Sequence, residues 1–165
     1  MPILRLNHAV LYVRDADRSA GFYERVLGFR RLPMALPGAV FLQAEGSRND
    51  HDLGLFSIGD DAGASKAGRD TVGLYHLAWE VDTLAELRRI AQALNAAGAL
   101  AGASAHGATK ALYGKDPDGI EFEVSWLVPA NQLPLNEGAV SRRLDLDAEI
   151  ERYGADTQGG IGISR

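Results

Sequence analysis

HGATKALYGKDPDGIEFEVSW, residues 106–126, combines a tight turn with an alternating strand, and the rest of the chain is organised around it. In the turn Asp116-Pro117-Asp118-Gly119 the proline presets its φ angle, the glycine can adopt a positive φ, and the aspartates can accept hydrogen bonds from nearby backbone amides. The strand alternates between an apolar and a polar set of side chains. The apolar set is Phe122, Val124 and Trp126, and the polar set is Glu121, Glu123 and Ser125. Because a carboxylate is costly to bury alone, the polar face requires water, a cation or a ligand opposite it.

Composition limits the classes of protein to consider. A chain of 165 residues with 46% hydrophobic and 24% charged residues indicates one globular domain over residues 1–165. The net charge of −5 and the absence of a long basic cluster argue against a nucleic-acid partner. The lack of cysteine excludes disulfides, thiolate metal sites and a cysteine nucleophile. No signal-peptide pattern or membrane-length apolar run is present, so we expect a cytoplasmic protein without a membrane partner.

Apolar periodicity and capping residues predict a series of short strands around two helices. Asp15 or Asp17 can cap the first helix and Gly28 can end it, while Asp82 or Thr83 can cap the second and Gly98 can end it. The expected elements are strands at 4–13, 30–32, 40–44 and 51–58, a helix at 16–27, a mobile connection at 59–73, a strand at 74–81, a helix at 84–97, and strands around 111–113 and 120–126.

The two halves of this series repeat one pattern. LNHAVLYV, residues 6–13, and LYHLAWEV, residues 74–81, both place histidine third, and each is followed by an acidic cap, an amphipathic helix, a glycine and further strands. Two βαβββ modules, over about 4–60 and 72–128, account for this pattern. We therefore predict an α+β fold with mostly antiparallel pairing, in which a curved mixed sheet forms a metal-binding cup. A C-terminal extension, 129–165, follows, with a possible helix at 144–153.

The polar faces of the long strands carry a set of metal-binding side chains. His8, His76 and Glu123 lie on the faces opposite the apolar residues that the helices should cover. Two imidazoles and one carboxylate are a facial triad for a divalent first-row metal, with positions left open for other ligands. The repeat strengthens this interpretation, because both histidines occupy the same place in their modules.

LNHAVLYVRD, GLYHLAWEVD and the closing DPDGIEFEV make the chain similar to the vicinal oxygen chelate superfamily. This superfamily includes glyoxalase I, fosfomycin-resistance proteins, methylmalonyl-CoA epimerases and type I extradiol ring-cleavage dioxygenases. In the closing motif of the family, the Glu four residues after the glycine is the usual metal ligand, which designates Glu123 and not Glu121. The resemblance covers residues 4–128. We expect Glu121, on the same face, to contact solvent or Lys110.

Two further features resemble the extradiol dioxygenases in particular. Glyoxalases and epimerases of the superfamily usually place a fourth ligand, Glu or Gln, on the last strand of the first module, where this chain has Gly54 or Leu55. The extradiol enzymes carry a His-Asp at the head of that strand, matched by His51-Asp52. They also carry a His-Gly before the closing motif, matched by His106-Gly107, and a Tyr ten residues before the ligand Glu, matched by Tyr113.

This resemblance implies roles for all four histidines. His8, His76 and Glu123 would hold Fe(II), or alternatively Mn(II) or another divalent metal, and a catechol and dioxygen would take the open positions. His51 would be the acid–base residue near dioxygen, which suits an imidazole because its pKa lies near working pH. His106 and Tyr113 would hydrogen-bond a catecholic oxygen. The implied activity is non-haem Fe(II)-dependent extradiol cleavage of a small aromatic diol, a reaction of aromatic catabolism.

Two other functional classes remain open at this point. One is a metal-dependent isomerase or lyase of the glyoxalase or epimerase type, which a fourth ligand from elsewhere would favour. The other is a non-catalytic small-molecule binding protein of the antibiotic-binding type. The chain has one pair of modules, whereas known extradiol enzymes with two pairs are twice as long, and it lacks the common Asn after Gly119. A half-open cup and the extension suggest a homodimer, with residues 135–153 near the interface or over the pocket.

Overall fold

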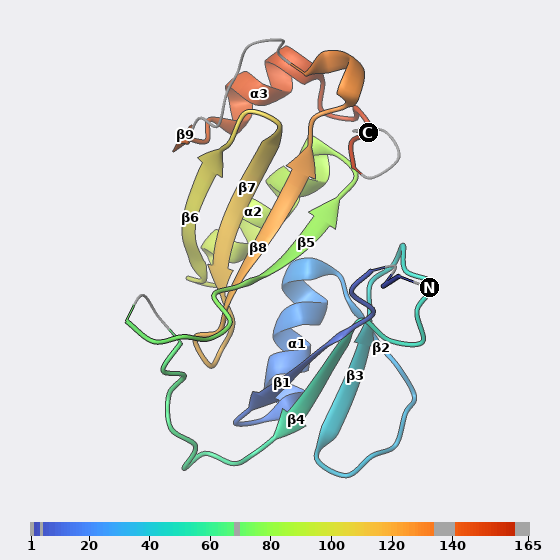
Figure 1. Ribbon diagram of the computed structural model, residues 1–165, viewed down its shortest axis with the longest axis vertical. Coiled ribbons are helices and arrows are strands. Elements are labelled where there is room, and N and C mark those ends of the chain that lie inside the picture. Colours follow the sequence, from blue (N-terminus) through green and yellow to red (C-terminus); the bar gives the residue numbers. More distant parts are fainter. Residues whose placement is uncertain (1, 4, 68–69, 134–140, 161–165) are drawn as a thin grey trace. The chain divides into compact units, whose positions relative to one another are not determined.

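The structure is a computed structural model that describes residues 2–3, 5–67, 70–133 and 141–160. The chain divides into two compact units (Figure 1). The first comprises Met1–Lys66 and the turn Asp116–Gly119, and the second comprises Ala67–Lys115 and Ile120–Arg165. Parts of the expected C-terminal extension, residues 134–140 and 161–165, lie outside the described residues.

The first unit is one βαβββ module. Its elements are β1 (Ala9–Val13), α1 (Ala16–Leu27), β2 (Arg30–Arg31), β3 (Ala39–Gln43) and β4 (Leu53–Ser57). The strand order is β1-β4-β3-β2, with β1 parallel to β4 and the other neighbours antiparallel. The predicted 16–27 helix is confirmed at both ends.

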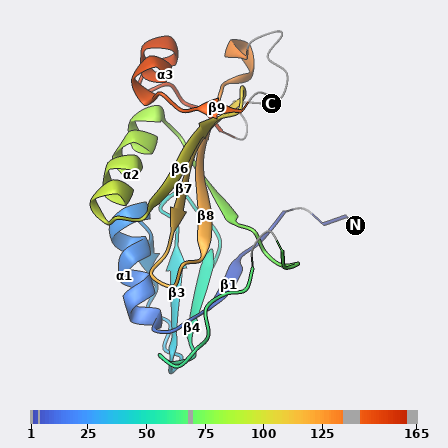
Figure 2. The same ribbon diagram turned by 90° about the vertical axis from the view of Figure 1, so that its left-hand side faces the viewer.

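Helix α1 begins and ends where its capping residues predict. The Asp15 side chain accepts a hydrogen bond from the backbone N–H of Arg18, and Gly28 adopts a φ of 73° at the other end. The helix lies on one face of the first sheet (Figure 2). The core there is built from buried apolar residues of the helix and of the sheet: Ala20, Tyr23 and Val26 from α1, and Leu11, Val13, Leu42, Leu53 and Leu55 from the strands.

The second unit repeats the module and adds the C-terminal extension. Its elements are β5 (Leu77–Val81), α2 (Leu84–Ala96), β6 (Leu100–Ala105), β7 (Thr109–Lys115), β8 (Glu121–Leu127), the 3-10 helix η1 (Ala130–Gln132), β9 (Arg142–Arg143) and α3 (Leu146–Tyr153). The strand order is β5-β8-β7-β6-β9, with β5 parallel to β8. The two sheets confirm the α+β fold of two βαβββ modules predicted from the repeat.

The alternation in the closing motif is confirmed by burial. Phe122, Val124 and Trp126 are fully buried on the α2 side of the second sheet, while Glu121 and Glu123 are partly exposed on the other side. We call that other side the Glu123 face. The buried residues of α2 complete the core: Leu84, Leu87, Ile90 and Leu94.

Some strands differ from the sequence prediction. β1 and β5 begin at Ala9 and Leu77, so that His8 and His76 each immediately precede a strand. β6 falls in the Gly/Ala-rich span LAGASA, whose low strand propensity predicts no strand. Its pairing with β7 supplies the backbone hydrogen bonds that hold this segment extended.

The extension forms a strand and a helix on the second unit. β9 pairs with the outer edge of β6, and α3 lies within the predicted range 144–153. An ion pair between Arg88 of α2 and Asp147 of α3 joins the two helices. Among the described residues, no helix has the length and apolar character needed to cross a membrane.

Candidate metal centre

The first unit brings His8 and His51 together. Their ring centroids lie 4.4 Å apart, and the His51 ring packs edge-on against Phe41 at 5.1 Å. His8 is exposed, and its Nδ1 lies 2.7 Å from the side-chain oxygen of Asn7. The His51 side chain, in contrast, is only 12% exposed. Within this unit, therefore, the predicted ligand and the predicted acid–base residue are neighbours.

Asp52 explains why His51 occupies this position. Its buried carboxylate accepts hydrogen bonds from the backbone N–H of Ala44 at 2.8 Å, from Ser47 Oγ at 2.7 Å and from Asn49 Nδ2 at 2.6 Å. Its carbonyl accepts from the backbone N–H of Ala9 at 2.9 Å. The loop before β4 is thus tied to the start of β1, which places His51 beside His8. Asp52 enters the sequence prediction only through the His51-Asp52 match, although the polar turn before it is typical of a capped loop.

The sequence left open whether Gly54 or Leu55 occupies the position of the fourth ligand in glyoxalases, and the structure distinguishes the two. Leu55 is fully buried in the core of the first unit. Gly54 pairs with Val10, and a Cβ added to it would lie 3.4 Å from Val10 Cγ2 and 3.5 Å from Phe41 Cε1. Since side chains alternate along a strand, Gly54 shares the face of His8 and Val10. A glycine at this position offers no side-chain ligand.

In the second unit, His76 and Glu123 are in direct contact. His76 Nε2 lies 3.2 Å from Glu123 Oε2, and both side chains are partly exposed. His76 Nδ1 is buried and has no hydrogen-bond partner among the described residues. The His76 ring is flanked by Tyr75 at 4.5 Å and Tyr113 at 5.8 Å. An imidazole nitrogen and a carboxylate oxygen that face each other are donors suited to a divalent first-row metal, so these residues fit two of the three predicted ligands.

Tyr113 lies directly opposite Glu123 in the β7–β8 pairing. Its hydroxyl is 3.1 Å from His106 Nε2, so the tyrosine and the histidine that were predicted to contact a catecholic oxygen form a hydrogen-bonded pair. Burial raises the pKa of the Tyr113 hydroxyl above its ordinary value, and the negative charge of Glu123 raises it further. The hydroxyl is therefore protonated at neutral pH.

The predicted site residues thus fall into two groups. His8 and His51 lie together in the first unit, and His76, Glu123, Tyr113 and His106 lie together in the second. Within either unit, the described residues contain no set of three His, Asp or Glu side chains suited to one metal ion. The three-ligand set of His8, His76 and Glu123 stays a prediction.

One predicted partner was wrong. Lys110 does not contact Glu121, because Lys110 is fully buried on the α2 side of the sheet, opposite Trp126 in the register. Its Nζ donates to the carbonyl of Gly107 at 3.0 Å and lies 3.2 Å from Glu149 Oε2. Glu121 lies opposite Lys115 instead. The register between two strands, which decides these faces, cannot be read from either strand alone.

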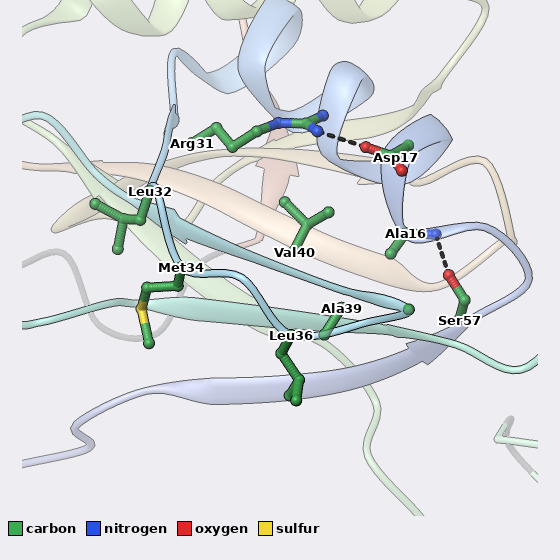
Figure 3. A pocket seen from close by; sticks show the side chains of 10 residues that line it. Ala16, Asp17, Arg31, Leu32, Met34, Leu36, Ala39, Val40 and Ser57 are labelled. Carbon is green, nitrogen blue, oxygen red and sulfur yellow. Dashed lines mark hydrogen bonds and ion pairs between the residues drawn. The ribbon is translucent and has the colours of Figure 1, made fainter.

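A separate pocket of about 280 Å³ lies in the first unit, between the start of α1 and the β2–β3 connection (Figure 3). Its polar groups already have partners: Arg31 pairs with Asp17, and the backbone N–H of Ala16 donates to Ser57 Oγ at 2.9 Å. None of the predicted site residues lines it. This pocket is not the candidate site.

Residues 5–124 match the family model of the Glyoxalase/Bleomycin resistance protein/Dioxygenase superfamily. The chain therefore belongs to this superfamily, which the closing motif and the repeated histidine strands had indicated. A search of proteins with curated descriptions finds no match.

Solved structures of the same fold include proteins of different activities. A glyoxylase/bleomycin resistance protein/dioxygenase domain from Frankia sp. EAN1pec is 23% identical, with a TM-score of 0.63, over 75% of this chain and 92% of that one. Lactoylglutathione lyase from Agrobacterium tumefaciens is 24% identical, with a TM-score of 0.56, over 76% and 95%. A mutant of the fosfomycin resistance protein FosX from Listeria monocytogenes, complexed with Mn(II) and 1S,2S-dihydroxypropylphosphonic acid, is 17% identical, with a TM-score of 0.55, over 74% and 90%. These similarities establish the fold alone.

Proposed function

We propose that this protein is a non-haem Fe(II)-dependent extradiol dioxygenase that cleaves the ring of a catecholic substrate. The observation that carries the proposal is the hydrogen-bonded pair of His106 and Tyr113 beside Glu123, with 3.1 Å between His106 Nε2 and the Tyr113 hydroxyl. In the proposed site, two groups that can transfer protons therefore lie next to the carboxylate that would bind the metal. A catechol needs such groups, because at least one of its hydroxyls must lose a proton before the ring reacts.

His8, His76 and Glu123 would hold the metal, which is Fe(II) in this proposal and Mn(II) or another divalent cation in its alternatives. When bound, iron would supply the electron exchange between a catechol and dioxygen that side chains cannot supply. The contact between His76 Nε2 and Glu123 Oε2 supports two of the three ligands. Gly54 supports a three-ligand set, since the face of His8 carries no fourth donor at this position of β4.

The side chains around the ligands would orient the substrate and move its protons. Tyr113 is protonated at neutral pH and can donate a hydrogen bond to a catecholic oxygen when the His106 tautomer that carries Nε2–H donates to the Tyr113 hydroxyl oxygen. His51 would exchange a proton with the reacting oxygen atoms, a role that an imidazole can perform near neutral pH. The Phe41 ring and the Asp52 loop hold His51 in place.

An isomerase or lyase of the glyoxalase type is the second candidate, because the superfamily contains such enzymes and their substrates also bind to a divalent metal. A small-molecule binding protein is the third. Oxygen separates the first candidate from the other two. A dioxygenase consumes one molecule of dioxygen per ring opened, whereas an isomerase or lyase has the same rate in an anaerobic cuvette, and a binding protein has no turnover.

The test is purification under anaerobic conditions, loading with Fe(II), metal analysis, and oxygen uptake against a panel of catechols. We expect uptake with at least one catechol and formation of a yellow ring-opened product, both lost in Glu123→Ala. If iron-loaded wild type consumes no catechol in air, the dioxygenase assignment is wrong and the isomerase–lyase class replaces it.

A further inference from the structure

Lys110 is a charged residue in the core of the second unit, and the proposed chemistry does not use it. Its side chain is fully buried on β7, on the face opposite Tyr113. Its Nζ donates a hydrogen bond to the carbonyl of Gly107 at 3.0 Å. An ammonium group removed from water in this way requires a counter-charge, because desolvation strongly disfavours an unpaired ion.

The counter-charge comes from the C-terminal extension. Glu149 of α3 is 6% exposed, and its Oε2 lies 3.2 Å from Lys110 Nζ. Its other oxygen lies 3.5 Å from Arg142 Nη2 on β9. The ring of Tyr153, also from α3, lies 5.5 Å from Lys110 Nζ. All three partners lie beyond residue 124, where the match to the superfamily ends.

On its other side, Lys110 contacts the turn that carries His106. Gly107 adopts a φ of 69°, a left-handed conformation that favours glycine, and the backbone N–H of His106 donates to the carbonyl of Thr109 at 2.8 Å. The Lys110 ammonium holds the Gly107 carbonyl from the α2 side. His106 precedes Gly107 in this turn, and its imidazole reaches Tyr113 on the Glu123 face.

We infer that the C-terminal extension positions His106 for its interaction with Tyr113, through the sequence of contacts Glu149–Lys110–Gly107. Glu149 holds the buried ammonium in place, and the ammonium fixes the Gly107–Ala108 peptide, one residue after His106. Lys110 and Glu149 are positioning residues, since neither lies on the Glu123 face. The inference rests on the proposed function only for the role of His106 in turnover; the orientation of His106 is a structural property that can be measured without substrate.

The alternative is that the Lys110–Glu149 ion pair only docks α3 onto the sheet. In that case a variant that lacks the ion pair but still docks α3 would leave the orientation of His106 unchanged. Arg88 and Asp147 provide the control, because this exposed ion pair also joins α3 to the second unit, while among the described residues neither side chain forms a hydrogen bond or ion pair with the 106–109 turn. Replacing both members of a buried ion pair by apolar residues of similar size is often neutral or stabilising, whereas removing one member leaves an unpaired buried charge. The double variant Lys110→Met/Glu149→Met therefore removes the ion pair and keeps a filled core.

The experiment compares this double variant with Arg88→Met/Asp147→Asn and wild type. Imidazole ¹H–¹³C spectra report on His106, whose signals are assigned from their disappearance in His106→Gln. We expect the His106 signals to shift and broaden in Lys110→Met/Glu149→Met, because the Gly107 carbonyl loses its donor, and to stay unchanged in the control. In iron-loaded enzyme we expect kcat to fall by about 10- to 100-fold with metal content unchanged, the size of effect that a small misplacement of a catalytic group produces.

Unchanged His106 signals in a folded double variant would overturn the inference, whatever the activity. If wild type has no dioxygenase activity but the His106 signals still respond to the double variant, the proposed function fails and the positioning role stands. If Lys110→Met/Glu149→Met does not fold, Glu149→Gln replaces it: this variant keeps the side-chain shape and removes the carboxylate charge. A His106 spectrum identical to wild type in Glu149→Gln would then overturn the inference.

Discussion

Asp118 lies in the turn Asp116–Gly119 of the first unit and contacts the residues around the start of α1 in the same unit. Its carboxylate is 7% exposed and accepts hydrogen bonds from the backbone N–H of Arg14 at 2.9 Å and from Arg14 Nη1 at 2.8 Å. Arg18 Nη2 adds a third contact. We predict that Asp118→Asn lowers the free energy of unfolding, because an amide keeps the shape of the side chain but loses its charge.

The magnitude follows from which of these contacts are shielded from water. A hydrogen bond to a charged group contributes about 1.5–3 kcal/mol, and the bond from the Arg14 backbone to Asp118 is of this kind. The Arg14 and Arg18 side chains are 26% and 45% exposed, so their ion pairs add about 0–1 kcal/mol each. Since asparagine retains one acceptor oxygen, we expect Asp118→Asn to cost about 1–2 kcal/mol and Asp118→Ala to cost about 2–4 kcal/mol.

The pH dependence gives a second measure of the same contacts. Burial alone would raise the pKa of Asp118, but the hydrogen bonds from Arg14 and the charge of Arg18 outweigh it, and the pKa is lowered from 3.8. The folded state therefore binds this proton less tightly than the unfolded state does. The stabilisation is present above about pH 3.8 and is lost as the pH falls through the lower, folded-state pKa.

The assay is urea denaturation of wild type, Asp118→Asn and Asp118→Ala at pH 7 and at several pH values below 4. Asp17→Asn is the control, because the Asp17 side chain is 77% exposed and its ion pair with Arg31 should change stability by less than about 0.5 kcal/mol. Equal stability of wild type and Asp118→Asn at pH 7 would refute the reasoning. A difference that persists undiminished to pH 2 would refute its electrostatic part.

Three further predictions concern the metal, the acid–base residues and a buried tyrosine. Glu123→Ala should lose stoichiometric Fe(II), measured by elemental analysis after anaerobic loading, and retention of one iron per chain would move the site elsewhere. His51→Ala should keep iron and catechol binding while kcat falls by on the order of 10²–10⁴, and Tyr113→Phe should keep iron while catechol turnover falls; loss of iron in either variant would contradict these roles. Burial, and then the charge of Asp116, raise the pKa of Tyr23 above 10, so its stabilisation is present below about pH 10 and lost above it. Tyr23→Phe should therefore unfold less readily than wild type as the pH rises from 10 to 12, and parallel unfolding curves would show that Tyr23 is not the titrating group.

The sequence was sufficient for the modules but not for the contacts between distant segments within a unit. Thr83, one of two candidate caps, begins α2 by accepting from the backbone N–H of Glu86, and Asp15 caps α1. Capping and alternation are local properties, so they can be read from neighbouring residues. Asp52 and the Lys110–Glu149 pair could not be found in this way, because each contact joins residues that only the folded chain brings together. Glu149 lies 39 residues beyond Lys110, in a segment for which the sequence predicted a helix but no contact with Lys110.

One part of the candidate site, the Tyr113–Glu123 pair, can be predicted from the sequence because it lies within the single β7–β8 hairpin. β7 and β8 form a hairpin centred on Asp118, so residues equally far before and after it face each other, and Tyr113 lies opposite Glu123, with the pair five residues on either side. The spacing of ten residues that marks the closing motif is thus the register of this hairpin. The positive φ of Gly119, 82°, and the bond from the Asp118 N–H to Asp116 Oδ1 fix the turn. A slip of one residue would turn every side chain of β8 to the opposite face, exchanging Glu123 with the buried Phe122 and Val124. The core that these apolar residues form therefore holds the Glu123 carboxylate and the Tyr113 hydroxyl in register.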